Sequence, residues 1–397
     1  MVGLKCDRNL GDQVIFQMSR YYLVGVLKEL GAEDVEIREM DMMGRDAPGR
    51  NLIREEFRKD FLFKLLRFSR RFYQGAAEKA EDYLQKITTE ECCGRYIDEN
   101  TIAVIFAGGG LIKYRVQTLY INIDVITRFA EKYGVPVMFS AVGVEGYDRD
   151  DYRCRMLVNA VKRKNVRFIS TRDDIETLRN HYSTESQITA LAADPACGAA
   201  AVFPPAEKQD RAVKTIGLGI ARKDIFRDYG VAFTEEQALA LWSSLYEMLT
   251  GRDYRCTVFC NGAVSDYSFI NEWADHMGFS PEMREAMIMN RPESSEELTE
   301  IITSCDGIIA TRLHTAILAY AYSIPSVSLV WNDKQLFFGR QIGAPERFIT
   351  FDGFDCGHIV ETLESAMENP RTNSDREKYI STTKEAIRDF LEPVVSN

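Results

Sequence analysis

Residues 308–334 constrain the fold most strongly, because they alternate twice between a strand pattern and a helix pattern. An apolar run ends at Ala310 and is typical of a buried strand. Apolar and small residues at helical spacing follow from Ala316, and Pro325 ends them. A second apolar, β-branched run over residues 326–331 predicts the next strand. A strand, a turn, a helix and another strand in this order are typical of a parallel α/β sheet.

Two side chains able to do chemistry, Arg312 and His314, stand at the turn between the first strand and the helix. In an open parallel sheet such a turn lies at the carboxyl end of a strand, where ligands bind, and a helix N-terminus there favours an anion. The planar fork of Arg312 suits a carboxylate or a phosphate, and His314 can give or take a proton near neutral pH. Lys334, at the end of the next strand, adds a cation. We therefore predict an anion site with acid–base chemistry; the alternative is a solvated arginine beside a structural histidine.

Charge and composition limit the partners of this chain. The 397 residues carry a formal net charge of −11, whereas a nucleic-acid-binding protein needs a basic face. We therefore expect no nucleic-acid partner, and positive charge concentrated only at an anionic ligand. The hydrophobic share of 45% is ample for cores, and the length predicts two or three domains.

The nine cysteines are scattered along the chain and match no zinc-binding spacing, so no metal is expected. Several stand in apolar runs typical of core positions, which favours a reducing compartment. The start of the chain lacks the layout of a signal peptide, and no apolar run is long enough to span a bilayer. These features predict a cytoplasmic location.

Strand and helix patterns alternate along the whole chain, which predicts two Rossmann-like parallel-sheet domains that face each other across a cleft. The first domain covers residues 1–200, with strands at 2–5, 35–40, 101–107, 135–142, 166–171 and 188–193 and helices at 13–30 and 117–133. Residues 201–214 contain two prolines and many charges and are predicted to be a linker. The second domain covers residues 215–397, with strands at 215–221, 254–261, 307–311, 326–331 and 347–351. Its helices are predicted at 234–250, 267–277, 295–305, 315–322 and 358–368, and a last helix at 375–391 could pack on either domain.

Further candidate site residues stand at strand ends in the first half. Gly108, Gly109 and Gly110 directly follow a buried strand, where they allow either close approach of a ligand or tight packing without one. Arg172 follows the strand 166–171 and repeats the pattern of a cation at a strand end. It is expected to converge with Arg312 and Lys334 in the cleft.

Acidic and amide side chains at loop ends are a second group of candidates. Asn9 and Asp12 stand in the turn before the first helix, where they cap the helix, contact a ligand, or do both. Glu145, in the loop 143–146, and Asp266 are further acidic candidates.

Residues 52–73 form a basic amphipathic helix pattern, with Phe57, Phe61, Leu65, Phe68 and Phe72 on one face and seven Arg and Lys residues around it. Such a helix can lie on anionic lipid, which would place the protein at the inner membrane face. The alternative, which we favour, is a helix that packs on the sheet with a solvated basic side.

The order and context of several short motifs resemble the polysaccharide pyruvyl transferase family over nearly the whole chain. These pieces are Asn9-Leu10-Gly11-Asp12, Gly108-Gly109-Gly110, Ser170-Thr171-Arg172-Asp173, Asp194-Pro195-Ala196, Arg312-Leu313-His314, Pro325 and Lys334. The resemblance implies a two-domain fold like that of the GT-B glycosyltransferases. It also implies transfer of pyruvate from phosphoenolpyruvate onto two hydroxyls of one sugar, as a cyclic ketal, with no other cofactor. Arg172, Arg312 and His314 would then face phosphoenolpyruvate, with Lys334 nearby. The acceptor would be a saccharide that is either free or lipid-linked, and Asp12, Glu145 and Asp266 are the candidates for contacts with its hydroxyls.

Two other functions fit parts of the pattern. A glycosyltransferase with a nucleotide-sugar donor would suit the glycine-rich loops, although no clear ribose-binding glutamate stands in residues 326–338. A binding or scaffold protein would suit the fold alone, but it gives no reason for the costly cluster of Arg312, His314 and Lys334.

Overall fold

The computed structural model describes residues 1–47, 50–51, 53, 55, 76–115, 119–207, 212–369 and 375–396. The predicted basic helix at 52–73 lies outside these residues, apart from Ile53 and Glu55. Its membrane contact therefore stays a prediction.

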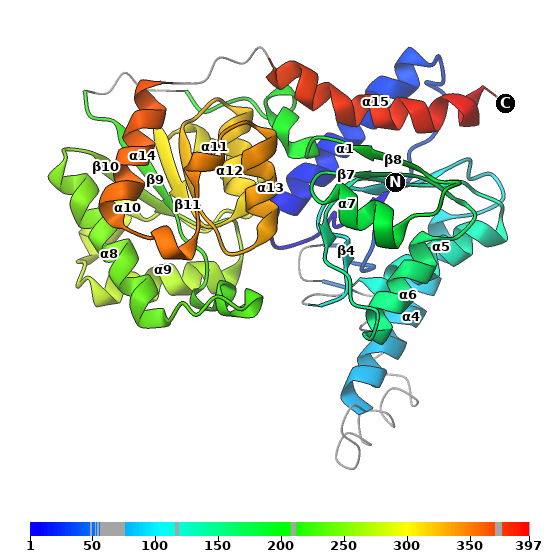
Figure 1. The fold of residues 1–397 in the computed structure, drawn as a ribbon, viewed down its shortest axis with the longest axis horizontal. Helices are drawn as coiled ribbons and strands as arrows, with labels where there is room; N and C mark the ends of the chain where they lie inside the picture. The colour runs from blue at the N-terminus through cyan, green and yellow to red at the C-terminus, as the bar shows by residue number, and fades with distance from the viewer. Residues whose placement is uncertain are drawn as a thin grey trace. The chain divides into compact units, whose positions relative to one another are not determined.

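The chain forms two compact units (Figure 1). The first consists of Met1–Asp7, Ile15–Pro195 and Tyr379–Asn397, and the second of Arg8–Val14 and Ala196–Lys378. Compared with the predicted division, the short segment Arg8–Val14 belongs with the second half of the chain, and most of the last helix belongs with the first half. The described residues of the predicted linker 201–214 are part of the second unit.

Within the described residues, the first unit has a parallel sheet of six strands. The strands are β1 (Val2–Gly3), β2 (Met40–Asp41), β3 (Val104–Ala107), β5 (Val137–Val142), β7 (Val166–Thr171) and β8 (Ile188–Leu191), in the order β2-β1-β3-β5-β7-β8. The strand order reverses between β1 and β3, so the loops that follow these two strands lie at the topological switch point.

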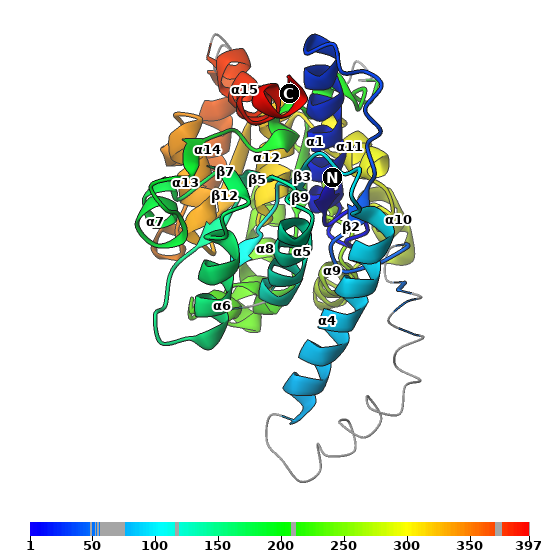
Figure 2. The same ribbon diagram turned by 90° about the vertical axis from the view of Figure 1, so that its right-hand side faces the viewer.

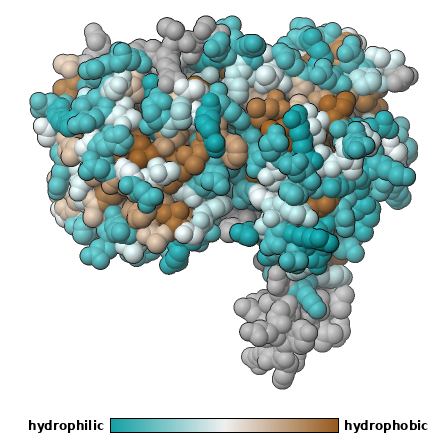
Figure 3. Space-filling view, in the orientation of Figure 1, coloured by the Kyte–Doolittle hydropathy of each residue, from teal (hydrophilic) through white to brown (hydrophobic). Residues whose placement is uncertain are grey.

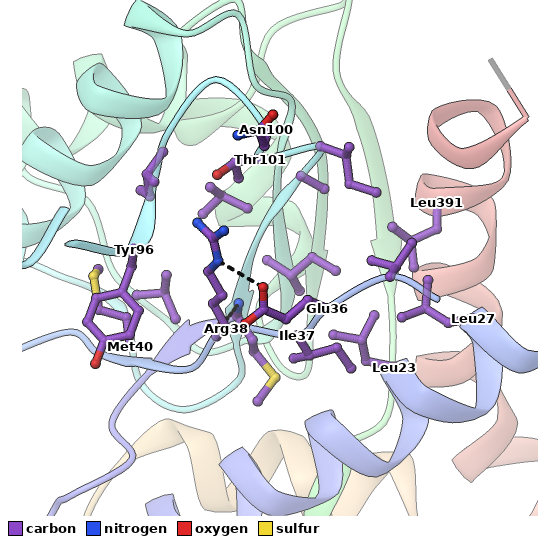
Figure 4. Close-up of a pocket in the computed structure, with 18 residues that line it drawn as sticks. Leu23, Leu27, Glu36, Ile37, Arg38, Met40, Tyr96, Asn100, Thr101 and Leu391 are labelled. Carbon is purple, nitrogen blue, oxygen red and sulfur yellow. Dashed lines mark hydrogen bonds and ion pairs between the residues drawn. The ribbon is translucent and has the colours of Figure 1, made fainter. Parts of the chain in front are cut away.

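The second strand is shorter than predicted and begins where the predicted strand ends. Residues 35–39 were expected to pair in the sheet, but Val35 and Ile37 instead line an apolar cavity of about 290 Å³ (Figure 4). Leu23 and Leu27 of helix α1 (Leu10–Glu29) and Leu391 also line this cavity. Val35 and Ile37 are half-buried, and their apolar pattern belongs to this cavity wall rather than to a paired strand.

Helices cover both faces of the first sheet. On one face α4 (Ala76–Tyr96), α5 (Tyr120–Lys132) and α6 (Tyr152–Val161) lie side by side, and on the other lie α1 and α15 (Arg376–Val395) (Figures 1 and 2). The carboxylate of Glu29 in α1 pairs with Lys384 and Arg388 of α15. This two-sided covering explains why the central strands β3 and β5 are buried along their whole length.

The sheet of the second unit is also parallel, with five strands among the described residues. They are β9 (Thr215–Gly219), β10 (Arg255–Phe259), β11 (Gly307–Ala310), β12 (Ser326–Leu329) and β13 (Phe348–Ile349), in the order β10-β9-β11-β12-β13. Helices α8 (Glu235–Gly251) and α14 (Cys356–Glu368) pack together on one face, and α11 (Ser295–Thr303) and α12 (Leu313–Ala321) pair on the other. The order again reverses beside the first strand in sequence, between β9 and β11.

The predicted fold class of two Rossmann-like parallel-sheet domains is confirmed. The sequence prediction missed helices α4 and α6 of the first unit and α10 (Pro281–Met287) and α13 (Asp333–Gln341) of the second. Helix α9 (Val264–His276) starts three residues earlier than expected. Polar side chains cover much of the face shown in Figure 3. Among the described helices, none combines the length and the apolar character needed to cross a membrane.

Candidate active site

The site in the second unit is built around the start of helix α12. Strand β11 ends at Ala310, Arg312 is the N-cap residue with an extended backbone, and the helix begins at Leu313. The helix therefore starts two residues earlier than predicted, and His314 lies in its first turn. Since β11 borders the switch point, Arg312 and His314 stand where parallel α/β sheets bind ligands, beside the partial positive charge of a helix N-terminus.

Arg312 is held by Asp266 in a two-point ion pair. Its Nε donates to Asp266 Oδ2 at 2.9 Å and its Nη2 donates to Asp266 Oδ1 at 2.8 Å. Asp266, in the first turn of α9, has a fully buried side chain, whereas that of Arg312 is 19% exposed. Burial by itself lowers the pKa of the Arg312 guanidinium, but the carboxylate of Asp266, helped by that of Asp12, outweighs burial and raises the pKa. The arginine is thus a fixed, permanently charged group that faces partly outward.

The interpretation of Asp266 as a sugar contact is wrong. Both of its oxygens accept hydrogen bonds from Arg312, and Oδ1 also accepts one from the backbone N–H of Arg222 at 2.9 Å. A fully buried carboxylate that is occupied in this way orients Arg312 instead. The spacing of 46 residues between the partners gives no local sequence signal for this role.

His314 is buried against the N-terminal end of helix α1. Its Nδ1 lies 3.5 Å from Asn9 Nδ2, which donates to Asp12 Oδ2 at 2.9 Å. A Cβ atom on Gly11 would lie 2.2 Å from the imidazole ring, so only glycine fits at this position. Asn9 and Asp12 therefore belong to the surroundings of His314, and their predicted contact with a ligand stays a prediction.

Asn261, at the end of β10, connects these elements and was missed by sequence reasoning. Its side chain is buried, and its Oδ1 accepts a hydrogen bond from Thr315 Oγ1 at 2.7 Å. Its backbone carbonyl accepts one from the N–H of Leu10 at 3.1 Å. Asn261 thus ties the segment Arg8–Val14 to the first turn of α12, and so fixes Gly11 against His314.

Lys334 lies in the first turn of α13 rather than at the end of a strand, because β12 already ends at Leu329. The next residue, Gln335, is fully buried and donates to the carbonyl of Thr311 at 3.0 Å. The indole of Trp331 donates to the same carbonyl at 2.7 Å. The start of α13 is thereby anchored to the residue that precedes Arg312, and Lys334 stands at the same edge of the sheet.

Arg172 lies at the carboxyl end of β7 in the first unit, as predicted from its position. Its side chain is 6% exposed and pairs with Asp194, whose side chain is 1% exposed. This pair explains why an aspartate closes the segment after β8. Arg172 belongs to one unit and Arg312 to the other, and their convergence on one ligand stays a prediction.

The three glycines after β3 pack against the loop after β5. Gly109 accepts a hydrogen bond from the N–H of Gly143 at 2.7 Å, and Gly108 has a φ of +40° and no room for a Cβ beside Ile15. The chain then forms a short ladder between β4 (Ile112–Lys113) and β6 (Val144–Glu145), which places Glu145 beside this loop. Tight packing against Ile15 therefore accounts for the glycine at 108. A ligand contact at Gly108, Gly109, Gly110 or Glu145 stays a prediction.

Within the described part of the chain, no group of three or more His, Cys, Asp or Glu side chains is placed to hold a metal ion.

The fold places this chain among proteins with two parallel-sheet units. Two parallel-sheet units of this kind resemble the GT-B type. UDP-GlcNAc 2-epimerase from Methanocaldococcus jannaschii matches with a TM-score of 0.57 at 12% identity, over 94% of this chain and 96% of that chain. The Rickettsia bellii UDP-N-acetylglucosamine 2-epimerase matches with a TM-score of 0.52 at 11% identity, over 96% and 92%. At such low identity these structures show the fold alone.

The chain belongs to the polysaccharide pyruvyl transferase family, whose model matches residues 9–333. The matched range contains the segment that packs on His314, the Arg312 site and Arg172. A curated relative, the amylovoran biosynthesis protein AmsJ of Erwinia amylovora, is 22% identical over 166 residues. The chain spans about two fifths of that relative's length, since the alignment covers 41% of this chain and 40% of AmsJ.

Proposed function

We propose that this protein transfers pyruvate from phosphoenolpyruvate onto two hydroxyls of one sugar in a cell-surface polysaccharide, an exopolysaccharide or its lipid-linked precursor. The product is a cyclic ketal, and phosphate is released. The family match supports pyruvyl transfer to a polysaccharide, and the relative's name supports exopolysaccharide synthesis. The observation that carries the proposal is that Arg312 and His314 stand together at the start of α12, with the arginine held by Asp266.

Recognition of the donor requires two anionic groups to be held at a fixed separation. Phosphoenolpyruvate carries a carboxylate and a phosphate on a three-carbon frame, so at least two cationic groups must face it. Arg312, fixed by Asp266, supplies one of them together with the N-terminus of α12. Lys334, at the same edge of the sheet, would supply the second, and Arg172 a third if the first unit contributes to the site.

Ketal formation needs a proton donor, and His314 is the residue we assign to it. The imidazolium gives its proton to the methylene carbon C3, which makes C2 an oxocarbenium-like centre. The first sugar hydroxyl forms a bond to C2, and the neutral imidazole accepts the proton of that hydroxyl. The contact with Asn9 and the packing of Gly11 hold the ring in one orientation, which favours proton transfer at a fixed point.

The phosphate then leaves C2 with the electron pair of the C–O bond, and the second hydroxyl attacks the same carbon. The proton of this second hydroxyl leaves with the phosphate, so one phosphoenolpyruvate and one diol give one ketal and one phosphate. Arg312 and the α12 N-terminus stabilise the charge that develops on the departing phosphate. Because the arginine is already oriented by Asp266, it needs no rearrangement during the reaction.

Thermal stabilisation by the donor tests this assignment. A ligand at about a hundred times its dissociation constant stabilises the folded state by about 2.7 kcal/mol. Phosphoenolpyruvate should therefore raise the Tm of the wild type and of a control variant, Arg252→Ala, whose arginine pairs with Glu364 elsewhere in the unit. It should not raise the Tm of Arg312→Ala. Stabilisation by UDP or GDP and not by phosphoenolpyruvate would instead support a nucleotide-sugar glycosyltransferase.

Turnover completes the test. With an acceptor saccharide present, the wild type should release phosphate from phosphoenolpyruvate, and His314→Gln should lose this activity while it still binds the donor. If His314→Gln were as active as the wild type, the acid–base role of His314 would be excluded. A scaffold protein would show neither phosphate release nor stabilisation by phosphoenolpyruvate.

We place this reaction in the cytoplasm, where phosphoenolpyruvate is formed. All nine cysteines are free in the structure, which suits a reducing compartment.

A further inference from the structure

An aromatic cluster that sequence reasoning did not single out lies at the carboxyl edge of the first sheet. Tyr147 follows strand β6 in the loop after β5, and its ring is stacked on that of His181. The ring centroids are 4.0 Å apart, and the angle between the ring planes is 2°. The residue is nevertheless 38% exposed. Tyr147 is thus an aromatic residue that stacks on an imidazole and still exposes more than a third of its surface.

The loop that carries the Tyr147 ring is held by Tyr182. The hydroxyl of Tyr182, a fully buried residue, donates to the carbonyl of Gly146 at 3.0 Å. The Tyr182 ring meets Tyr147 edge-on, with 6.1 Å between the ring centroids. Gly146 has a φ of +61°, which only glycine adopts readily, and this turn directs Tyr147. The ring is therefore held in place before any ligand arrives, and binding loses little conformational entropy.

Polar groups of both charge signs lie near the ring. Arg115 and Asp148 form an exposed ion pair of 3.9 Å, and Glu145 and Lys113 lie on the paired strands β6 and β4. A nucleic acid needs a surface dominated by positive charge, which this one is not. Hydrogen-bond donors and acceptors around a flat aromatic ring instead suit a neutral ligand with many hydroxyl groups and one apolar face.

We infer that Tyr147 and His181 form a stacking platform for a sugar ring of the saccharide acceptor. The C–H groups on one face of a pyranose carry a partial positive charge and lie against the electron-rich face of an aromatic ring. The sugar hydroxyls then reach the surrounding polar side chains. The platform lies at the carboxyl edge of the first sheet, where the loops after β3, β5 and β7 also end. The identification of the sugar as the acceptor rests on the proposed function, whereas sugar binding itself does not.

Saturation-transfer difference NMR with a set of methyl glycosides tests the binding. The probes are the methyl pyranosides of glucose, galactose, mannose, N-acetylglucosamine and N-acetylmannosamine. At least one should receive saturation at the C–H protons of one ring face from the wild type. Tyr147→Ala should abolish this transfer, and Tyr147→Phe, which keeps the ring, should retain it.

Tyr133→Ala is the matched control, because Tyr133 is equally exposed, at 37%, but follows α5 at the opposite, amino edge of the sheet. It should leave saturation transfer unchanged. The inference is overturned if no glycoside receives saturation from the wild type, or if Tyr147→Ala keeps the transfer.

Kinetics separate this inference from the proposed function. If the wild type releases phosphate from phosphoenolpyruvate, Tyr147→Ala should raise the KM for the acceptor about tenfold and leave the KM for phosphoenolpyruvate unchanged. An unchanged acceptor KM would reject the stacking role of Tyr147 and leave the proposed transferase function untouched. If the wild type binds glycosides through Tyr147 but releases no phosphate, the proposed transferase function is rejected and the stacking role of Tyr147 stands.

Discussion

Arg312 depends on a residue 46 positions earlier in the chain. The pair with Asp266 is bidentate, and the Asp266 side chain is fully buried, so loss of Arg312 removes the counter-charge of a buried carboxylate. Removal of the Asp266 carboxylate has the matching effect, because it leaves the partly buried guanidinium of Arg312 without a counter-charge. The two residues therefore form one structural unit, in which Asp266 fixes the orientation of Arg312.

Asp266→Asn should lower the free energy of unfolding by about 3 kcal/mol, since it breaks a buried ion pair. It should also raise the KM for phosphoenolpyruvate, because Arg312 loses its fixed orientation. Urea unfolding and steady-state kinetics measure the two effects. The double variant Asp266→Asn/Arg312→Met should regain part of the lost stability but no activity. If Asp266→Asn kept both wild-type stability and the wild-type KM, the positioning role would be rejected.

Gly11 and Gly25 offer a matched comparison within helix α1. A Cβ on Gly11 would lie 2.2 Å from the His314 ring, whereas a Cβ on Gly25 would meet only Lys384 Cε, at 3.8 Å. Gly11→Ala should displace the imidazole and lower the rate of pyruvyl transfer by about a hundredfold. Gly25→Ala should keep full activity and stabilise the helix by up to about 1 kcal/mol. Equal activity of the two variants would show that the packing of α1 on His314 is not required.

At the residue scale, the places of Arg312 and His314 at a strand end and a helix start could be predicted, because this is a local pattern. Their part in a ligand site stays a prediction. The sequence alone was not sufficient to assign the contact between Asp266 and Arg312 or to find Asn261. Their roles arise from contacts across the sheet edge, and a single sequence has no periodicity that reports such contacts. Gly11 belongs to the same group, since its steric role depends on a helix 300 residues further along.

At the element scale, the alternation of strand and helix patterns predicted the order of the strands, but it did not predict several strand and helix boundaries. The strand predicted at 35–40 became the two-residue β2, because its apolar residues line a cavity. Helix α13 escaped prediction, because the charged and polar residues at its start do not show a clear apolar face. The grouping of Arg8–Val14 with the second unit could not be inferred, since it depends on hydrogen bonds to Asn261 rather than on position in the chain.

Helix α15 is tied to the end of the first sheet by a buried hydroxyl. Thr383 is fully buried and donates to the carbonyl of Ala193 at 2.6 Å, next to the partner of Arg172, Asp194. Thr383→Val keeps the shape of the side chain but leaves this carbonyl without its donor, which should cost about 1 to 3 kcal/mol of unfolding free energy. Thr250→Val is the control, because the exposed Thr250 hydroxyl donates to the carbonyl of Tyr246 within the same helix. This variant should change the free energy of unfolding by less than about 0.5 kcal/mol.

Urea denaturation measures both threonine variants. A similar small loss for the two would mean that the contact between α15 and the end of the sheet contributes little to the stability of the first unit.

At the scale of the whole molecule, the cysteines report how completely the two units are packed. All nine are free, eight are buried, and Cys356 alone is partly exposed. Burial raises the pKa of the Cys256 thiol to about 12 and that of Cys92 to about 11. Since the thiolate is the reactive form, a raised pKa lowers the reactive fraction at pH 8, and burial also denies access to reagents.

We therefore expect 5,5′-dithiobis(2-nitrobenzoate) at pH 8 to react rapidly with at most one thiol of the native protein, and with nine after unfolding in urea. Burial raises the pKa of Cys356 as well, so the fast reaction should accelerate as the pH is raised from 8 to 9. Cys356→Ser should remove the fast reaction and leave eight thiols in urea. Several fast thiols in the native protein would show that the cores of the units open readily. Fewer than nine thiols in unfolded, non-reduced protein would reveal disulfides and contradict the reducing compartment in which we place the reaction.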